Sequence, residues 1–266
     1  MRRAAFFDLD KTVIARASMV AYGRPLFREG LLSATALARA LTMQLVYLHF
    51  GAGDSRMQKT RQRVLELAKG ADRDELARLV RETLGEVIEP IIFVEALDLI
   101  EGHRAAGDLV FIVSASPEEI VVPLAELLGA DGAIASRAVV DDDGRYTGEI
   151  ERYAYGPAKA EAIRDEAGHR GIDLAQSFAY SDSMTDLPML EAVGHPRAVN
   201  PDRALARTAE EREWPILNFT SPVRLRDRMP VPAFSTAAIT GVALAAATGA
   251  AFYAWRHTQH RLSAAS

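Results

Sequence analysis

The chain from residue 91 onward alternates between short apolar runs and stretches with helical spacing. Apolar runs at 109–113, 177–180, 197–199 and 215–219 are separated by segments in which apolar residues recur every three or four positions. Strands that alternate with helices in this way form a mainly parallel sheet with helices on both faces. The sequence therefore predicts an α/β fold with a Rossmann-like sheet.

One more apolar run stands at the start of the chain. Residues 3–9 end in acidic side chains, which is typical of a buried strand that carries carboxylates at its carboxyl end. No convincing strand follows over residues 15–90, where apolar residues recur at helical spacing. We therefore expect a core of residues 1–14 and 91–222 with a helical cap, residues 15–90, inserted after the first strand.

Two local signals refine this pattern. Asp72 followed by Glu75 resembles a capping box, which predicts that a helix begins there and covers 73–88. Residues 141–144 read Asp-Asp-Asp-Gly between two apolar runs, which predicts a hairpin turn.

The last part of the chain contains a long uncharged segment. Residues 233–255 would form a helix of roughly 34 Å, enough for a hydrocarbon core of about 30 Å. Aromatic residues cluster at one end and arginines flank both sides, as at a membrane interface. We expect a linker over 223–232, a transmembrane helix over 233–255 and a short tail over 256–266. A buried alanine-rich core helix or a disordered tail is the alternative.

Charge around this segment suggests an orientation. Three arginines precede it and two follow, a slight bias toward a cytoplasmic body, and the chain's start is too acidic for a signal peptide. We therefore expect a single-pass protein of the cell inner membrane with its catalytic domain in the cytoplasm. Small residues recur every four positions at Ala237, Gly241, Ala245 and Gly249, which would permit a homodimer.

Composition excludes several classes of function. The chain has no cysteine, so disulfides, thiolate zinc sites, iron–sulfur clusters and a cysteine nucleophile are all excluded. The net charge is −5, and the part before Arg224 is more acidic still because the tail is basic. Non-specific nucleic-acid binding depends on lysine and arginine, so we expect no nucleic-acid partner.

Polar side chains follow the predicted strands at their carboxyl ends, the edge where such sheets bind ligands. Asp8 and Asp10 follow the first strand, Ser114 the second, and Asp182 a later one, with Asp186 close behind. Converging carboxylates repel one another unless a cation lies among them, and hard oxygen ligands select Mg²⁺. We expect a Mg²⁺ site formed by Asp8, Asp10, Asp182 and Asp186.

The spacing of Asp8 and Asp10 suits phosphoryl transfer in two steps, because side chains two apart on a strand can face one site. Asp8 would attack phosphorus and form an aspartyl phosphate. Asp10 would protonate the leaving oxygen and later deprotonate water. The hydroxyl of Ser114 and the ammonium of Lys159 would hold the phosphoryl oxygens.

Four segments occur in a characteristic order. They are FFDLDKTV at 6–13, VSAS at 113–116, Lys159 after AYGPA, and YSDSMTDLPML at 180–190. This set resembles the four motifs of the haloacid dehalogenase superfamily, subfamily IB, the phosphoserine-phosphatase-like branch, over about residues 3–220. The resemblance implies a phosphatase with a cap between its first two motifs. It implies Mg²⁺ held by the side chains of Asp8 and Asp182 and the backbone carbonyl of Asp10, with Asp186 close by.

Two departures from the branch bear on the substrate. Phosphoserine phosphatases usually show GDGxND where this chain has SDSMTD, and a cap glutamate where this chain has Ala17. Without that carboxylate the amino group of phosphoserine has no partner, so we do not expect serine as the leaving group. A small-molecule or lipid-headgroup phosphomonoester is expected instead.

The predicted function is therefore a membrane-anchored, Mg²⁺-dependent phosphomonoester hydrolase. A phosphotransferase or phosphomutase that uses the same aspartyl phosphate is an alternative. A non-catalytic regulatory protein that binds phosphoryl groups is another, although every expected catalytic side chain is present.

Overall fold

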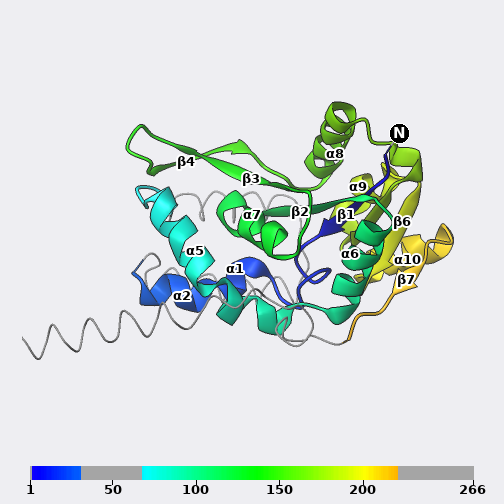
Figure 1. Cartoon of the computed structure of the whole chain (residues 1–266), viewed down its shortest axis with the longest axis horizontal. Helices are drawn as coiled ribbons and strands as arrows, with labels where there is room; N and C mark the ends of the chain where they lie inside the picture. The colour runs from blue at the N-terminus through cyan, green and yellow to red at the C-terminus, as the bar shows by residue number, and fades with distance from the viewer. Residues whose placement is uncertain (1, 31–67, 221–266) are drawn as a thin grey trace, which may run out of the picture. The chain divides into compact units, whose positions relative to one another are not determined.

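The structure, a computed structural model, describes residues 2–30 and 68–220 and centres on one sheet (Figure 1). Its order is β4-β3-β2-β1-β5-β6-β7, and neighbouring strands are parallel except β3 and β4. The strands are β1 Ala4–Asp8, β2 Leu109–Pro117, β3 Gly132–Val140, β4 Tyr146–Arg152, β5 Phe178–Ser181, β6 His195–Val199 and β7 Ile216–Leu217. This confirms the predicted α/β fold with a mainly parallel, Rossmann-like sheet.

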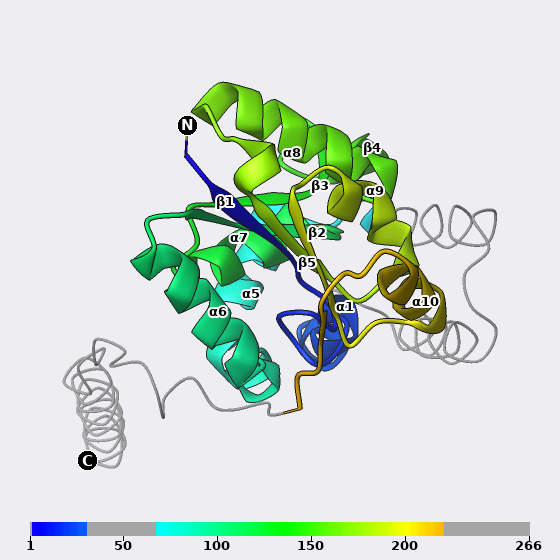
Figure 2. The same cartoon turned by 90° about the vertical axis from the view of Figure 1, so that its right-hand side faces the viewer.

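Helices cover both faces of the sheet, as Figure 2 shows. On one face, α6 contacts β1 and β2 while α7 contacts β2 and β3; on the other, α8 contacts β3, α9 contacts β5 and β6, and α10 contacts β6. The α-helices are α1 Ser18–Ala21, α2 Gly23–Arg28, α5 Arg73–Val87, α6 Val94–Ala105, α7 Glu118–Leu127, α8 Pro157–Arg170, α9 Leu187–Glu191 and α10 Arg203–Glu211. The 3-10 helices are η1 Glu89–Ile91, η2 Leu174–Gln176 and η3 Met184–Asp186.

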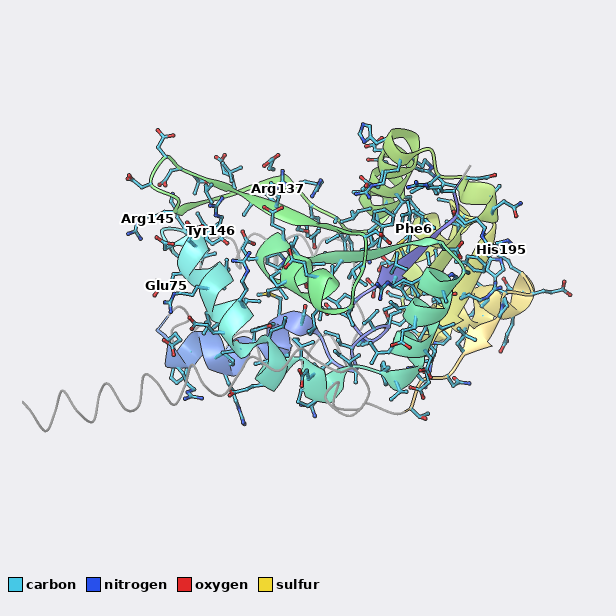
Figure 3. The ribbon with its side chains drawn as sticks, in the orientation of Figure 1. Phe6, Glu75, Arg137, Arg145, Tyr146 and His195 are labelled. Atoms are coloured by element: carbon cyan, nitrogen blue, oxygen red, sulfur yellow. The ribbon has the colours of Figure 1, made fainter. Side chains whose placement is uncertain are left out.

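The central strand β1 is buried on both faces. Phe6 stacks on Phe111 in an apolar cluster completed by α8, α9 and α10, and Figure 3 shows Phe6 inside the molecule. The next residue, Phe7, points the other way and stacks on Tyr180 with 4.3 Å between ring centroids. Successive side chains on a strand face opposite sides, so an apolar run is what a strand covered on both faces requires.

The inserted segment leaves and rejoins the core at adjacent points. Ala15 donates its backbone N–H to Ile91 (2.7 Å), and Phe93 donates to Val13 (3.0 Å). Helices α1, α2 and α5 belong to this segment, whose residues 31–67 lie outside the described part of the chain. We propose that this inserted segment, residues 15–90, forms the cap.

Helix α5 begins where the sequence predicts. The side chain of Asp72 accepts hydrogen bonds from the backbone N–H groups of Asp74 and Glu75, so it caps the helix. The helix runs from Arg73 to Val87, one residue shorter than predicted. An aspartate in this position satisfies donors that the first helical turn leaves without partners.

The start of α5 is also bonded to the hairpin formed by β3 and β4. The backbone N–H of Tyr146 donates to Ala71 (3.0 Å), and the carbonyl of Tyr146 accepts from Gly70 (2.8 Å). Figure 3 labels Arg145 and Tyr146 of the hairpin and Glu75 of α5 at this end of the molecule. These bonds join the part of the inserted segment just before α5 to an edge of the sheet.

The structure contradicts the prediction of a transmembrane helix. Within residues 2–30 and 68–220, no helix has the length and apolar character that crossing a membrane requires. The longest of them, α5, has 15 residues, roughly 22 Å, against a hydrocarbon core of about 30 Å. The predicted linker 223–232, helix 233–255 and tail 256–266 lie outside the described residues. On this finding we withdraw both the transmembrane helix and the single-pass inner-membrane localisation.

The close approach at Gly194 gives a test of this packing. Gly194 donates its N–H to Leu174 (2.9 Å), and a Cβ at Gly194 would lie 1.7 Å from the carbonyl oxygen of Ala175. Gly194→Ala should therefore lower the free energy of unfolding by about 3 kcal/mol, measured by urea denaturation, because backbone atoms must move apart.

The matched control is Gly168→Ala in α8, where an added Cβ meets nothing within 4 Å. That variant should be as stable as the wild type or up to about 1 kcal/mol more stable, because alanine favours a helix. Equal stability of Gly194→Ala and the wild type would contradict the packing of β6 against η2.

Candidate active site

The ends of three neighbouring strands bring the predicted site residues to one edge of the sheet. Asp8 ends β1 and pairs with Val113 of β2, so Ser114 is the next residue along β2. On the other side of β1, the parallel strand β5 ends at Ser181, and Asp182 follows directly. Side chains from β1, β2 and β5 therefore lie at the carboxyl edge, where sheets of this kind bind ligands.

A buried lysine joins two of the carboxylates. Lys159, 3% exposed, donates from Nζ to Oδ1 of Asp8 at 2.5 Å and to Oδ2 of Asp186 at 2.6 Å. Its position follows from the start of α8, because Gly156 adopts φ 57° and ψ −128° before Pro157. That conformation is open to glycine and strained for other residues. The first turn of α8 thus aims the ammonium group at the end of β1.

The loop after β5 holds the remaining two acids. Ser181 donates its hydroxyl to Oδ2 of Asp186 (2.7 Å), the same oxygen that Lys159 contacts. Asp182 is 8% exposed, and its Oδ2 lies 3.9 Å from the ammonium of Lys11. Asp186 is therefore fixed by two donors, whereas the Asp182 carboxylate is paired with Lys11 at a longer distance.

Asp10 follows β1 in a tight turn that leads toward the inserted segment. The carbonyl of Leu9 accepts from the backbone N–H groups of Val13 (2.9 Å) and Ile14 (3.0 Å), which closes the turn. Oδ1 of Asp10 accepts from the backbone N–H of Ser18, the first residue of α1, at 2.8 Å. The carboxyl group of Asp10 is thereby held by the inserted segment.

Ser114 and its neighbour Ser116 connect the second strand to the same helix. The hydroxyl oxygen of Ser114 accepts from the backbone N–H of Ser116 (3.1 Å). The hydroxyl of Ser116 is hydrogen-bonded to that of Ser18 at 2.7 Å. All three side chains are buried, so α1 closes over the ends of β1 and β2.

Burial dominates the electrostatics of the first two acids. It raises the pKa of Asp8 well above its ordinary value, against the opposing charge of Lys159 and in the same direction as Asp186 and Asp182. Burial also raises the pKa of Asp10, and the backbone N–H of Ser18 opposes this shift. Both carboxylates lie where the charged form is disfavoured unless a cation is near.

Burial also dominates the electrostatics of Asp182, on the other side of the site. Burial raises the pKa of Asp182 to about 7; Lys11 opposes this shift, and the charge of Asp186 adds to it. Burial alone would lower the pKa of Lys159, but the carboxylates of Asp186 and Asp8 outweigh it and keep the pKa above its ordinary value. Lys159 is therefore a fixed cation.

The donor set fits a hard divalent cation in charge and in chemistry. Four carboxylates, from Asp8, Asp10, Asp182 and Asp186, lie near one buried ammonium group, and burial raises the pKa of Asp8, Asp10 and Asp182. Oxygen ligands of this kind suit Mg²⁺. Within residues 2–30 and 68–220, however, no three histidine, aspartate or glutamate side chains are gathered closely enough to hold a metal ion. The predicted metal roles stay predictions.

The structure gathers all six predicted site residues at this edge, by different contacts. Asp8, Lys159 and Asp186 are in direct contact, and Asp182 and Ser114 follow the strands that flank β1. Asp10 is connected to β2 through Ser18, which is hydrogen-bonded to both Asp10 and Ser116.

Three residues here were not among the predicted site residues: Ser18, Ser116 and Ser181. Ser116 could have been found from strand alternation, since it lies two positions after Ser114. Nothing in the local pattern marks Ser18, because its contacts with Asp10 and Ser116 depend on how α1 folds back.

Comparisons with known proteins agree with this architecture. A family model for haloacid dehalogenase-like hydrolases matches residues 5–191. The chain is 48% identical over 256 residues to a probable phosphatase of Mycobacterium tuberculosis, covering 95% of this chain and 88% of that protein. A phosphoserine phosphatase of the same organism is 34% identical over 247 residues, covering 91% and 79%.

Among solved structures, a protein of unknown function from Bordetella pertussis superposes with a TM-score of 0.70 at 33% identity, covering 82% of this chain and 98% of that one. The family match spans more than half of the chain and includes β1, β2, the start of α8 and β5. The chain therefore belongs to the haloacid dehalogenase-like hydrolases, and it is a phosphatase of their phosphoserine-phosphatase-like branch.

Proposed function

We propose that this phosphatase hydrolyses a phosphomonoester in two steps, with Asp8 as the nucleophile and Mg²⁺ as cofactor. The observation that carries the proposal is the contact of one buried ammonium group, Lys159, with Asp8 at 2.5 Å and Asp186 at 2.6 Å. A cation fixed beside a carboxylate at the ligand-binding edge suits a dianionic phosphoryl group. The chemistry of the neighbouring side chains supports the same two-step mechanism.

In the first step, an oxygen of Asp8 bonds to phosphorus while the bond between phosphorus and the leaving oxygen breaks. Asp10 gives its proton to that oxygen, and the alcohol departs. In the second step, a water molecule transfers a proton to Asp10 and bonds to phosphorus. The bond from phosphorus to Asp8 breaks, and inorganic phosphate leaves with both carboxyl groups restored.

Asp10 suits the acid–base role because its environment keeps a proton available. Burial raises the pKa of Asp10, and the N–H of Ser18 fixes the direction of one of its oxygens. A general acid works best when its pKa lies near the operating pH. The other oxygen of Asp10 is then the one that exchanges the proton.

Ser114 and Lys159 would hold the phosphoryl oxygens during both steps. Lys159 stays charged, as its raised pKa indicates. The oxygen of the Ser114 hydroxyl accepts from the N–H of Ser116, and its hydrogen can be donated to a phosphoryl oxygen. Fixed donors aimed at a phosphoryl group stabilise the charge that spreads over its oxygens in the transition state.

Mg²⁺ would be held by the side chains of Asp8 and Asp182 and the backbone carbonyl of Asp10, with Asp186 nearby. Bound there, it would neutralise charge on the phosphoryl oxygens. Asp182 is the strongest candidate ligand because its carboxylate is buried and its ion pair with Lys11 is long, at 3.9 Å. Asp186, bonded to Lys159 and Ser181, would orient the ammonium group instead of reacting.

The substrate class is a small phosphomonoester other than phosphoserine. Residue 17, where phosphoserine phosphatases carry a glutamate, is alanine and directly precedes α1. No carboxylate is present there to pair with an ammonium group.

Replacing the nucleophile tests the mechanism. Asp8→Asn should lower kcat/KM for p-nitrophenyl phosphate at least roughly a thousandfold, because an amide cannot form the acyl phosphate. The matched control is Asp165→Asn, an exposed carboxylate of α8, which should retain wild-type activity. Activity of Asp8→Asn within tenfold of the wild type would refute covalent catalysis by Asp8.

Removal of divalent cations tests the cofactor. Dialysis against EDTA should abolish hydrolysis, and added Mg²⁺ should restore it, because buried carboxylates otherwise repel the phosphoryl group. Mg²⁺ should also raise the melting temperature of the wild type but not of Asp182→Asn. Full activity after exhaustive chelation would contradict a metal-dependent reaction.

Removal of the buried ammonium group should affect folding as well as catalysis. Lys159→Met leaves Asp8 and Asp186 without their cation, which should cost about 3 kcal/mol of unfolding free energy at neutral pH in EDTA. The loss should shrink as the pH falls, because protonated carboxyl groups need no counter-charge. Urea denaturation across pH measures it.

The exposed Lys69→Met is the control and should be as stable as the wild type at every pH. A Lys159→Met protein with wild-type stability at neutral pH would show that the contacts of Lys159 do not compensate buried charge.

A further inference from the structure

A tyrosine in the inserted segment carries a buried hydroxyl group that nothing in the described structure satisfies. Tyr22 is 0% exposed and is among the largest fully buried side chains. Its hydroxyl has no hydrogen-bond partner among the residues that the structure describes. Burial raises the pKa of Tyr22, so the group stays protonated and can both donate and accept.

Tyr22 lies on the same face of its helix as a residue that contacts the active site. Tyr22 joins α1 to α2 and donates its backbone N–H to the carbonyl of Ser18 at 3.0 Å, and Leu26 donates in turn to Tyr22 at 3.0 Å. Ser18, Tyr22 and Leu26 therefore lie one above another on a single buried face. The opposite face carries the exposed side chains of Val20 and Phe27.

Ser18, on this buried face, contacts two parts of the proposed active site. Its backbone N–H bonds to Asp10, the proposed acid, and its hydroxyl bonds to Ser116 beside the proposed phosphate site. Tyr22 is one helical turn further on, about 5.4 Å along the axis. Tyr22 therefore lies one turn away, on the same buried face, from the residue that contacts both Asp10 and Ser116.

A buried hydroxyl without a partner is costly, and phenylalanine would fill the same space without that cost. The cost disappears when a ligand brings a polar atom to the hydroxyl. The helix from residue 18 to residue 28 carries no acidic side chain, so an ammonium group would find no counter-charge there. A neutral hydrogen-bonding group matches this surface best.

We propose that Tyr22 is a specificity-determining residue whose hydroxyl binds the leaving group of the substrate. The substrate class is then a phosphomonoester of a small alcohol that bears a neutral polar group, such as a second hydroxyl. This inference rests on the proposed function, because it takes Asp8 and Asp10 as the point where the phosphoryl group is transferred.

The test compares two isosteric substrates on the full-length protein. 3-Hydroxypropyl phosphate carries a hydroxyl where n-butyl phosphate carries a methyl group. The wild type should prefer the hydroxyl compound roughly tenfold in kcat/KM, mainly through KM. Tyr22→Phe should reduce this preference to about one while hydrolysing phenyl phosphate within roughly twofold of the wild type.

The control is Tyr146→Phe, which removes another buried hydroxyl, beside Glu119, in the hairpin that is bonded to α5. That variant should keep the wild-type preference. The melting temperature of Tyr22→Phe should equal or exceed that of the wild type, because an orphaned hydroxyl is removed. This measurement separates a lost contact from a misfolded protein.

The outcomes distinguish this inference from the function on which it rests. Hydrolysis of phenyl phosphate with no preference in the wild type, or an equal preference in Tyr22→Phe, overturns the role of Tyr22 and leaves the phosphatase mechanism standing. A wild type that hydrolyses none of the three phosphates overturns the proposed function and this inference together.

Discussion

The contact of the Lys159 ammonium with Asp8 and Asp186 is the interaction on which the site depends. Buried carboxylates are unstable in a folded protein unless positive charge is close. Lys159 supplies that charge from the first turn of α8, so the end of β1 and the loop after β5 are fixed relative to each other. Its single charge is less than the surrounding carboxylates require, which leaves the site suited to bind a further cation.

The sheet provides the geometry that makes this contact possible. Parallel pairing of β1 with β2 and β5 sets Asp8 level with the last residues of its neighbours, so polar groups from all three strands face one edge. The apolar residues before Asp8 fix that register, because a shift by one residue would turn Phe6 and Phe7 to the wrong faces. Packing in the core thus determines where the carboxyl group of Asp8 lies.

Local patterns in the sequence were enough to predict the sheet, its helices on both faces and the acids at strand ends. They did not predict that β2 continues past residue 113 to Pro117, because its register with β3 shifts between these positions and Pro117 pairs with Ser136. Ser18 and Ser116 were missed for a related reason: their bond joins residues that are distant in the chain. The transmembrane helix was inferred from residues outside the described structure, and no described helix supports it.

In the proposed mechanism, Asp8 carries the phosphoryl group between substrate and water. The most direct measurement is to mix the protein with radiolabelled phenyl phosphate, quench with acid within the first turnover, and map the labelled peptide. We expect label on the peptide that contains Asp8, removable by hydroxylamine as expected for an acyl phosphate. Label on Ser114 or another residue, or turnover with no labelled protein at any time, would contradict it.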